Sequence, residues 1–171
     1  MNKYRIINNS EEKLNKGEVC FVAIENTDER ERFFVDLFER IGDDPDNKVL
    51  WWYQLDNSPI IMNYAIETGR AVHIHLVETE KGFQLSPSSE SLKKANLNKQ
   101  RRPYRVPGCT IDFILDGSKK IMKYRPFDYM LVDCTGLWGR PEYNNLDEEF
   151  VQNMEQFAMK FDISIVAAVY P

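Results

Sequence analysis

Four apolar runs separated by helical patterns constrain the fold of this chain more than any other feature. The runs are GEVCFVAIE (17–25), KVLWWYQL (48–55), FDYMLVDCTG (127–136) and DISIVAAVYP (162–171). Short segments that are apolar at nearly every position are typical of strands buried on both faces, as in the centre of a parallel sheet. Parallel strands are joined through crossover helices. The sequence therefore predicts an α/β fold with a mainly parallel central sheet and helices on both faces.

The segments between these runs carry helical signals. Helices are predicted over residues 27–41, 59–68 and 147–161. The first of them places Phe34, Leu37 and Ile41 on one face, and Gly42, a residue type common just after helices, follows it. Each predicted helix thus has an apolar face with which it can cover the sheet.

Two further segments carry weaker patterns. Residues 70–87 are predicted to form a strand that turns near Glu80 into a hairpin. The apolar run CTIDFIL (109–115) is predicted as a strand, followed by a helix that Ser118 caps and that ends before Pro126.

The chain is expected to contain one domain and a short N-terminal arm. Residues 1–16 are polar apart from Tyr4, Ile6 and Ile7, so they are predicted to be an arm or a flanking strand. Residues 17–171 contain no internal repeat and no linker-like stretch, and we expect them to fold together with a polar loop at about 86–108. A chain of this length buries a sufficient core without a disulfide or a metal.

Composition narrows the classes of partner. The formal net charge of −5 argues against a nonspecific nucleic-acid coat and against a polybasic membrane binder. The three cysteines, Cys20, Cys109 and Cys134, form no CxxC pair and are typical of reduced thiols in a cytoplasmic protein. Cys134 is expected to be buried and inert. Because no long apolar stretch is present, we expect no membrane association.

Four segments, taken in order, resemble the ATPase domain of RecA-like proteins. They are Gly17-Glu18 with the strand and helix after it, KVLWWYQLDNS, the Walker B-like FDYMLVDCTGLW, and EEFVQNMEQFAMKF with DISIVAAVYP. Their order and spacing are similar to those of DnaB-type replicative helicases and their KaiC- and RadA-type relatives. The resemblance covers about residues 17–171 and implies a RecA-like fold, with another doubly wound three-layer sandwich as the alternative.

This resemblance gives roles to two aspartates. Asp133 stands in the metal-aspartate position of the Walker B strand, and Asp56 stands near an acidic catalytic position. Both are candidate catalytic residues of an enzyme that depends on ATP and magnesium or on another metal. From the residues alone, an aspartate that ends a strand and precedes Thr135 and Gly136 is better explained as capping the loop after it, because no phosphate-binding loop accompanies it.

The resemblance fails at the phosphate-binding loop. The family's Gly-Lys-Ser/Thr falls on Glu29, Arg30 and Glu31, and no glycine lies between Gly17 and Gly42. A phosphate loop needs glycines to turn its N–H groups inward, a lysine for the outer phosphates and a hydroxyl for magnesium. Carboxylates about 4–6 Å from a phosphate charge each cost on the order of 3–4 kcal/mol at an effective dielectric near 20. We therefore expect no nucleotide cofactor. The same acids also suit the positive end of their helix.

Two histidines form a candidate metal site. His73 and His75 alternate on a predicted strand, so their side chains share one face. Zinc or another transition metal would need a carboxylate as well, for which Glu78 and Asp112 are candidates. The alternative is a polar strand face.

A basic segment is the candidate nucleic-acid site. From residue 93 to residue 105 the chain carries six basic residues, no acidic residue, and one tyrosine suited to base stacking: Lys93, Lys94, Lys99, Arg101, Arg102, Tyr104 and Arg105. In an acidic chain such a run can bind the phosphates of a single strand. The alternative is a solvated loop.

Taken together, these patterns predict a non-catalytic RecA-like domain that acts as a binding or regulatory module. We expect a protein partner or self-association, in connection with DNA replication, recombination or a related ATPase. Trp138, in a loop after a strand, is expected to belong to the partner surface. The alternatives are an enzyme that uses Asp133 and Asp56, and an accessory protein that binds single-stranded nucleic acid through residues 93–105.

Overall fold

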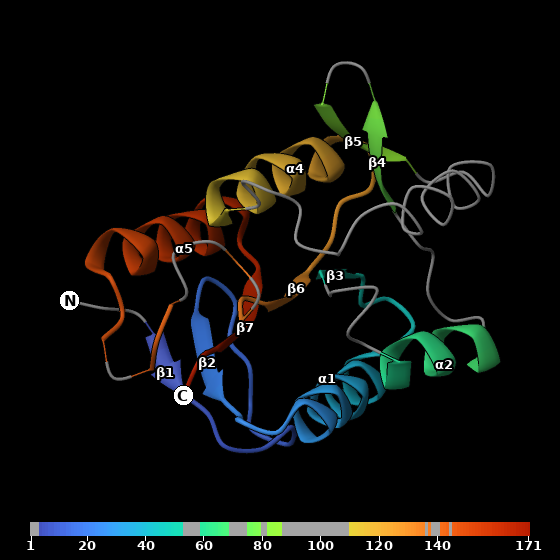
Figure 1. Cartoon of the computed structure of the whole chain (residues 1–171), viewed down its shortest axis with the longest axis vertical. Coiled ribbons are helices and arrows are strands. Elements are labelled where there is room, and N and C mark those ends of the chain that lie inside the picture. Colours follow the sequence, from blue (N-terminus) through green and yellow to red (C-terminus); the bar gives the residue numbers. More distant parts are fainter. Residues whose placement is uncertain are drawn as a thin grey trace.

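A five-stranded parallel sheet forms the centre of the molecule (Figure 1). The computed structural model describes residues 4–52, 59–68, 75–79, 82–86, 110–135, 137, 141–143 and 145–171. The strands of the sheet are β1 (Tyr4–Ile6), β2 (Val19–Ala23), β3 (Val49–Trp52), β6 (Tyr129–Asp133) and β7 (Ser164–Val169). They lie in the order β1-β2-β7-β6-β3, and every neighbouring pair is parallel. The predicted α/β fold with a parallel central sheet is confirmed.

Helices pack on this sheet through two separate core clusters. The described helices are α1 (Thr27–Ile41), α2 (Pro59–Thr68), α4 (Ile111–Tyr124) and α5 (Glu148–Phe161). Alternate residues of β7 enter different clusters: Ile165 and Ala167 pack with residues of α4 and α5, whereas Val166 and Ala168 pack with residues of α1. In Figure 1, α4 and α5 lie above the strands and α1 lies below them. The period of two along β7 therefore decides which helix each side chain meets.

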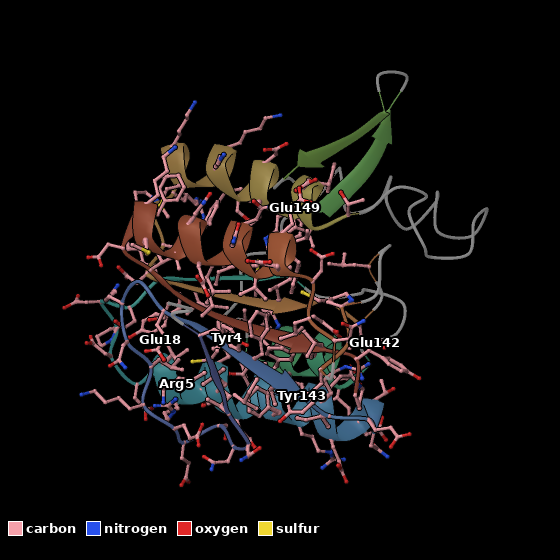
Figure 2. All side chains as sticks on the ribbon, turned by 90° about the vertical axis from the view of Figure 1, so that its left-hand side faces the viewer. Tyr4, Arg5, Glu18, Glu142, Tyr143 and Glu149 are labelled. Atoms are coloured by element: carbon pink, nitrogen blue, oxygen red, sulfur yellow. The ribbon has the colours of Figure 1, made fainter. Side chains whose placement is uncertain are left out.

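The N-terminal strand β1 covers the outer edge of β2. Tyr4 packs edge-on against Phe21 with ring centroids 5.5 Å apart, and the Ile7 N–H donates to the Phe21 carbonyl at 2.9 Å. Figure 2 shows Arg5 of β1 beside Glu18, with which it forms an ion pair. These contacts hold the first described residues in register with the centre of the sheet.

The connection between β1 and β2 is hydrogen-bonded to the last turn of α1. Arg40, in the last turn of α1, donates to the carbonyls of Ser10 and Glu12 at 2.6 and 2.7 Å. The Ser164 hydroxyl of β7 donates to the Asn15 carbonyl at 2.7 Å. Gly17 then turns the chain into β2 with a φ of 77°, a left-handed conformation that favours glycine.

The prediction of a strand over residues 109–115 is wrong, because its residues 111–115 form the start of α4. Thr110, rather than Ser118, caps this helix: its hydroxyl accepts a hydrogen bond from the Phe113 N–H at 3.3 Å. Ser118 is instead fully buried in the middle of the helix, where it accepts from the Trp52 indole N–H at 3.0 Å. Ile114, Leu115 and Ser118 follow a helical spacing, and their burial in one face outweighs the strand preference of the short apolar run.

The predicted hairpin is present as a separate two-stranded sheet. Strands β4 (His75–Thr79) and β5 (Gly82–Ser86) pair antiparallel, with Thr79 opposite Gly82. Within the described part of the chain, no helix is long and apolar enough to cross a membrane.

Candidate functional site

The carboxyl ends of β2 and β6 lie on either side of β7, at the edge where sheets of this kind bind ligands. In open α/β sheets, ligands lie beyond the carboxyl ends of the strands, where the connections leave in opposite directions. β2 leads into α1 and β6 leads toward α5, and these helices belong to different core clusters. The register places Ala23 opposite Val169 and Asp133 opposite Ala168, so β2 and β6 end within one residue of each other, with β7 between them.

A buried ion pair between Arg30 and Asp133 joins α1 to the carboxyl end of β6. The Arg30 Nε lies 3.1 Å from the Asp133 Oδ2, and the two side chains are 12% and 8% exposed. A second guanidinium nitrogen of Arg30 donates to the Ile24 carbonyl at 3.3 Å. The Thr135 N–H and hydroxyl donate to the Asp133 Oδ1 at 3.0 and 2.6 Å. Both carboxylate oxygens of Asp133 are therefore engaged by the protein itself.

The connection between β2 and α1 is too short to form a phosphate cradle. Only residues 24–26 separate the two elements, and none of them is glycine. The Asn26 side chain caps α1 by accepting from the Glu29 N–H at 3.0 Å, so Glu29, Arg30 and Glu31 all lie inside the helix. A phosphate-binding loop instead wraps successive backbone N–H groups of a glycine-rich segment around the phosphates. This connection has neither the length nor the glycines for that geometry.

A shallow acidic hollow lies in front of this connection. It has a volume of about 490 Å³ and is lined by Ala23, Ile24, Glu25, Asn26 and Glu29. The acidic side chains of Glu25, Asp28 and Glu29 are exposed to solvent. Solvent screening therefore reduces their repulsion of a phosphate well below the value expected for buried charges.

Glu31 does not join the ion pair of Arg30 and Asp133 but contacts α2. It is 2% exposed, and its Oε1 accepts a hydrogen bond from the Ile61 N–H in the first turn of α2 at 3.5 Å. Burial raises the pKa of the Glu31 carboxyl, and the N–H groups of Ile61 and Ile60 offset only part of that effect. The sequence does contain a signal for this placement, because Glu31 stands three residues before Phe34 on the apolar face of α1.

Most of the other predicted site residues lie outside the described part of the chain. These are Asp56, His73, Lys93, Lys94, Lys99, Arg101, Arg102, Tyr104, Arg105 and Trp138. His75 and Glu78 lie in β4, whose backbone alone is described, and Asp112 is exposed in the first turn of α4. Among the described residues, no group of three His, Cys, Asp or Glu side chains is placed to hold a metal ion.

The two described cysteines are buried. Cys20 and Cys134 are each at most 1% exposed. Burial raises the pKa of the Cys20 thiol to about 11, which keeps it protonated at neutral pH. Since the thiolate is the reactive form, the structure favours an inert role for Cys20.

Comparison with known proteins adds no family to this geometry. No protein-family model matches the chain, and no curated protein matches it significantly in sequence.

Proposed function

We propose that this chain is a non-catalytic RecA-like domain that acts as a binding or regulatory module. The proposed partners are another protein or a second copy of the chain, in connection with DNA replication, recombination or a related ATPase. The alternation of β2, α1, β3, β6, α5 and β7 follows the order of the segments that resemble this family. The observation that carries the proposal is the ion pair between Arg30 and Asp133.

The ion pair supports the proposal because both of its residues stand at positions that contact the nucleotide or its metal in the family that the chain resembles. In the resemblance, Arg30 replaces the phosphate-loop lysine and Asp133 is the metal aspartate, so a bound nucleotide and its magnesium would separate these two positions. Here the side chains bond each other directly at 3.1 Å. Separating a buried pair is costly unless each charge finds a new partner, and micromolar affinity is worth only roughly 8 kcal/mol. A nucleotide would have to offset that cost without a phosphate cradle.

We expect no binding of ATP with magnesium at micromolar concentrations. Isothermal titration calorimetry of the full chain should give no saturable heat, and a sensitive phosphate-release assay should give no hydrolysis. The Arg30→Ala variant is the informative companion, because it removes the ion pair while leaving the short connection. It should also fail to bind. Micromolar affinity in the unmodified chain would overturn the proposal. Binding gained only by the variant would show that Arg30 alone prevents nucleotide binding.

A second candidate function, binding of single-stranded nucleic acid, is favoured by the basic segment from Lys93 to Arg105. Reversing Arg101 and Arg102 to glutamate should weaken binding to a single-stranded oligonucleotide and reduce the slope of log affinity against log salt by about 1.4, since each phosphate contact contributes about 0.7. Fluorescence anisotropy over a series of salt concentrations measures both quantities.

The matched control for this test reverses two exposed lysines elsewhere. Lys119 and Lys120 lie on the exposed side of α4, so reversing them changes the net charge by the same amount without touching the basic segment. If both double variants weaken binding equally, the effect is one of net charge alone. If the unmodified chain does not bind at low salt, this candidate function is wrong.

A further inference from the structure

We propose that the docking of α2 on α1 is linked to protonation of Glu31, so that the first turn of α2 detaches more readily as the pH rises. This inference concerns a conformational device in the fold and does not depend on the proposed function. It would give the chain a pH-sensitive element beside the carboxyl end of the sheet.

Two carboxylates of α1 hold α2 at separate points. Glu31 accepts from the Ile61 backbone N–H at 3.5 Å, and Glu39, two turns later, accepts from the Tyr64 hydroxyl at 2.5 Å. The ring of Phe38 packs edge-on against Tyr64 with centroids 6.0 Å apart. Ile61 itself is 1% exposed. The hydrogen bond of Glu39 is half-buried, whereas that of Glu31 is fully buried. Of these two carboxylates, only Glu31 is therefore shielded from water.

The Glu31 carboxylate is incompletely paired in this position. Its Oε1 faces the start of α2, and its Oε2 has no hydrogen-bond partner among the described residues. A buried carboxylate that lacks part of its hydrogen bonding is costly when ionised. The charged groups that act on it from the described elements are Asp28, which disfavours the ionised form, and Arg30, which favours it. Arg30 is already paired with Asp133 of β6, so its positive charge only partly stabilises the ionised form of Glu31.

The direction of the pH dependence follows from this environment. Burial holds the pKa of Glu31 above its ordinary value of 4.5 while α2 is docked. When α2 detaches, the carboxyl meets water and returns toward that value. Between the two values, the docked state binds the proton and the detached state does not. Each pH unit in that window therefore increases the detached population by up to about tenfold, and docking is tightest below the ordinary value.

Amide hydrogen exchange measures this directly. Protection factors of peptides covering residues 59–68, corrected for the intrinsic pH dependence of exchange, should fall by up to about tenfold per pH unit above the ordinary glutamate pKa and then level off. A parallel NMR titration of the Glu31 side-chain carboxyl carbon should give a midpoint above the ordinary glutamate pKa, at the pH where the loss of protection levels off. Peptides from β7 should show no comparable change, because β7 lies in the centre of the sheet.

Two variants separate Glu31 from the other carboxylate. Glu31→Gln keeps an acceptor for the Ile61 N–H and cannot ionise, so its α2 protection should not vary with pH. Glu39→Gln keeps an acceptor for Tyr64 and should retain the full pH dependence. The inference is overturned if Glu31→Gln preserves the slope, if Glu31 titrates at its ordinary value, or if α2 and β7 lose protection together.

Discussion

Replacing Asp133 with asparagine is expected to lower the free energy of unfolding by about 3–5 kcal/mol. Asparagine keeps the size of the side chain and an oxygen for the Thr135 hydrogen bonds, but it leaves the Arg30 guanidinium, 12% exposed, without its counter-charge. A buried charge without its partner is among the most destabilising single changes in a protein. Urea unfolding followed by tryptophan fluorescence gives the value.

The chain supplies a matched control for this prediction. Lys16 and Asp128 also form an ion pair, at 3.2 Å, but their side chains are 43% and 40% exposed. Solvent screens such a pair, so Lys16→Met should change the stability by at most about 1 kcal/mol. Combining Arg30→Met with Asp133→Asn removes both charges and should cost less than the sum of the single variants.

The same variant distinguishes the enzyme alternative. If Asp133 served catalysis in a stable scaffold, Asp133→Asn would abolish an ATP-dependent activity while leaving the free energy of unfolding within about 1 kcal/mol of the unmodified chain. If the unmodified chain has no ATP-dependent activity and Asp133→Asn is less stable, the result agrees instead with a structural ion pair. Measuring the ATPase activity of the unmodified chain and of the variant beside their free energies of unfolding distinguishes these outcomes.

Replacing Phe21 with alanine is expected to cost about 3–5 kcal/mol, for a different reason. Phe21 is fully buried in β2, and its ring lies 5.5 Å from that of Tyr4 in β1 and 5.8 Å from that of Phe150 in α5. Alanine would leave a cavity at the junction of the edge strand, the sheet and a helix. Chemical denaturation measures the loss, and amide exchange at Ile6 and Ile7 should show that β1 is released first.

Met159 provides the comparison for this core substitution. It is 52% exposed on α5, so Met159→Ala should change the stability by no more than about 0.5 kcal/mol. If Phe21→Ala proved equally mild, the pairing of β1 with β2 and the contact with Phe150 would both be in doubt.

Local patterns were sufficient for most elements and failed where a helix contains a strand-like run. The strands from Val19, Val49, Tyr129 and Ser164 were predictable because they are apolar at nearly every position. The prediction for the segment after Thr110 was wrong because four of the next five residues are apolar, which is typical of a short strand, while the helical spacing emerges only over the full length of α4. Gly117, a residue type that weakens helices, lies in its middle and further hides the pattern.

The sequence was sufficient to select the residues of the candidate site, but not to predict which of them contact one another. The resemblance singled out Arg30 and Asp133 separately, yet they are 103 residues apart in the chain, and only the order of the strands brings them together. The sequence likewise showed Glu31 as one of three acids at a helix start. That it alone is buried depends on where α2 lies, a tertiary fact that no local pattern contains.

The position of β7 has a consequence for how this chain reaches its native state. β7 lies between β2 and β6, although it is the last of these strands along the chain, and its Ser164 bonds to Asn15 across 149 residues. Before the ribosome has synthesised β7, β1 can pair with β2, and β3 can pair with β6. These two strand pairs cannot yet form one sheet, because β7 lies between them in the native order. Their inner edges stay open until β7 emerges. We expect slow folding dominated by this late insertion, and nascent chains that depend on chaperones until it occurs.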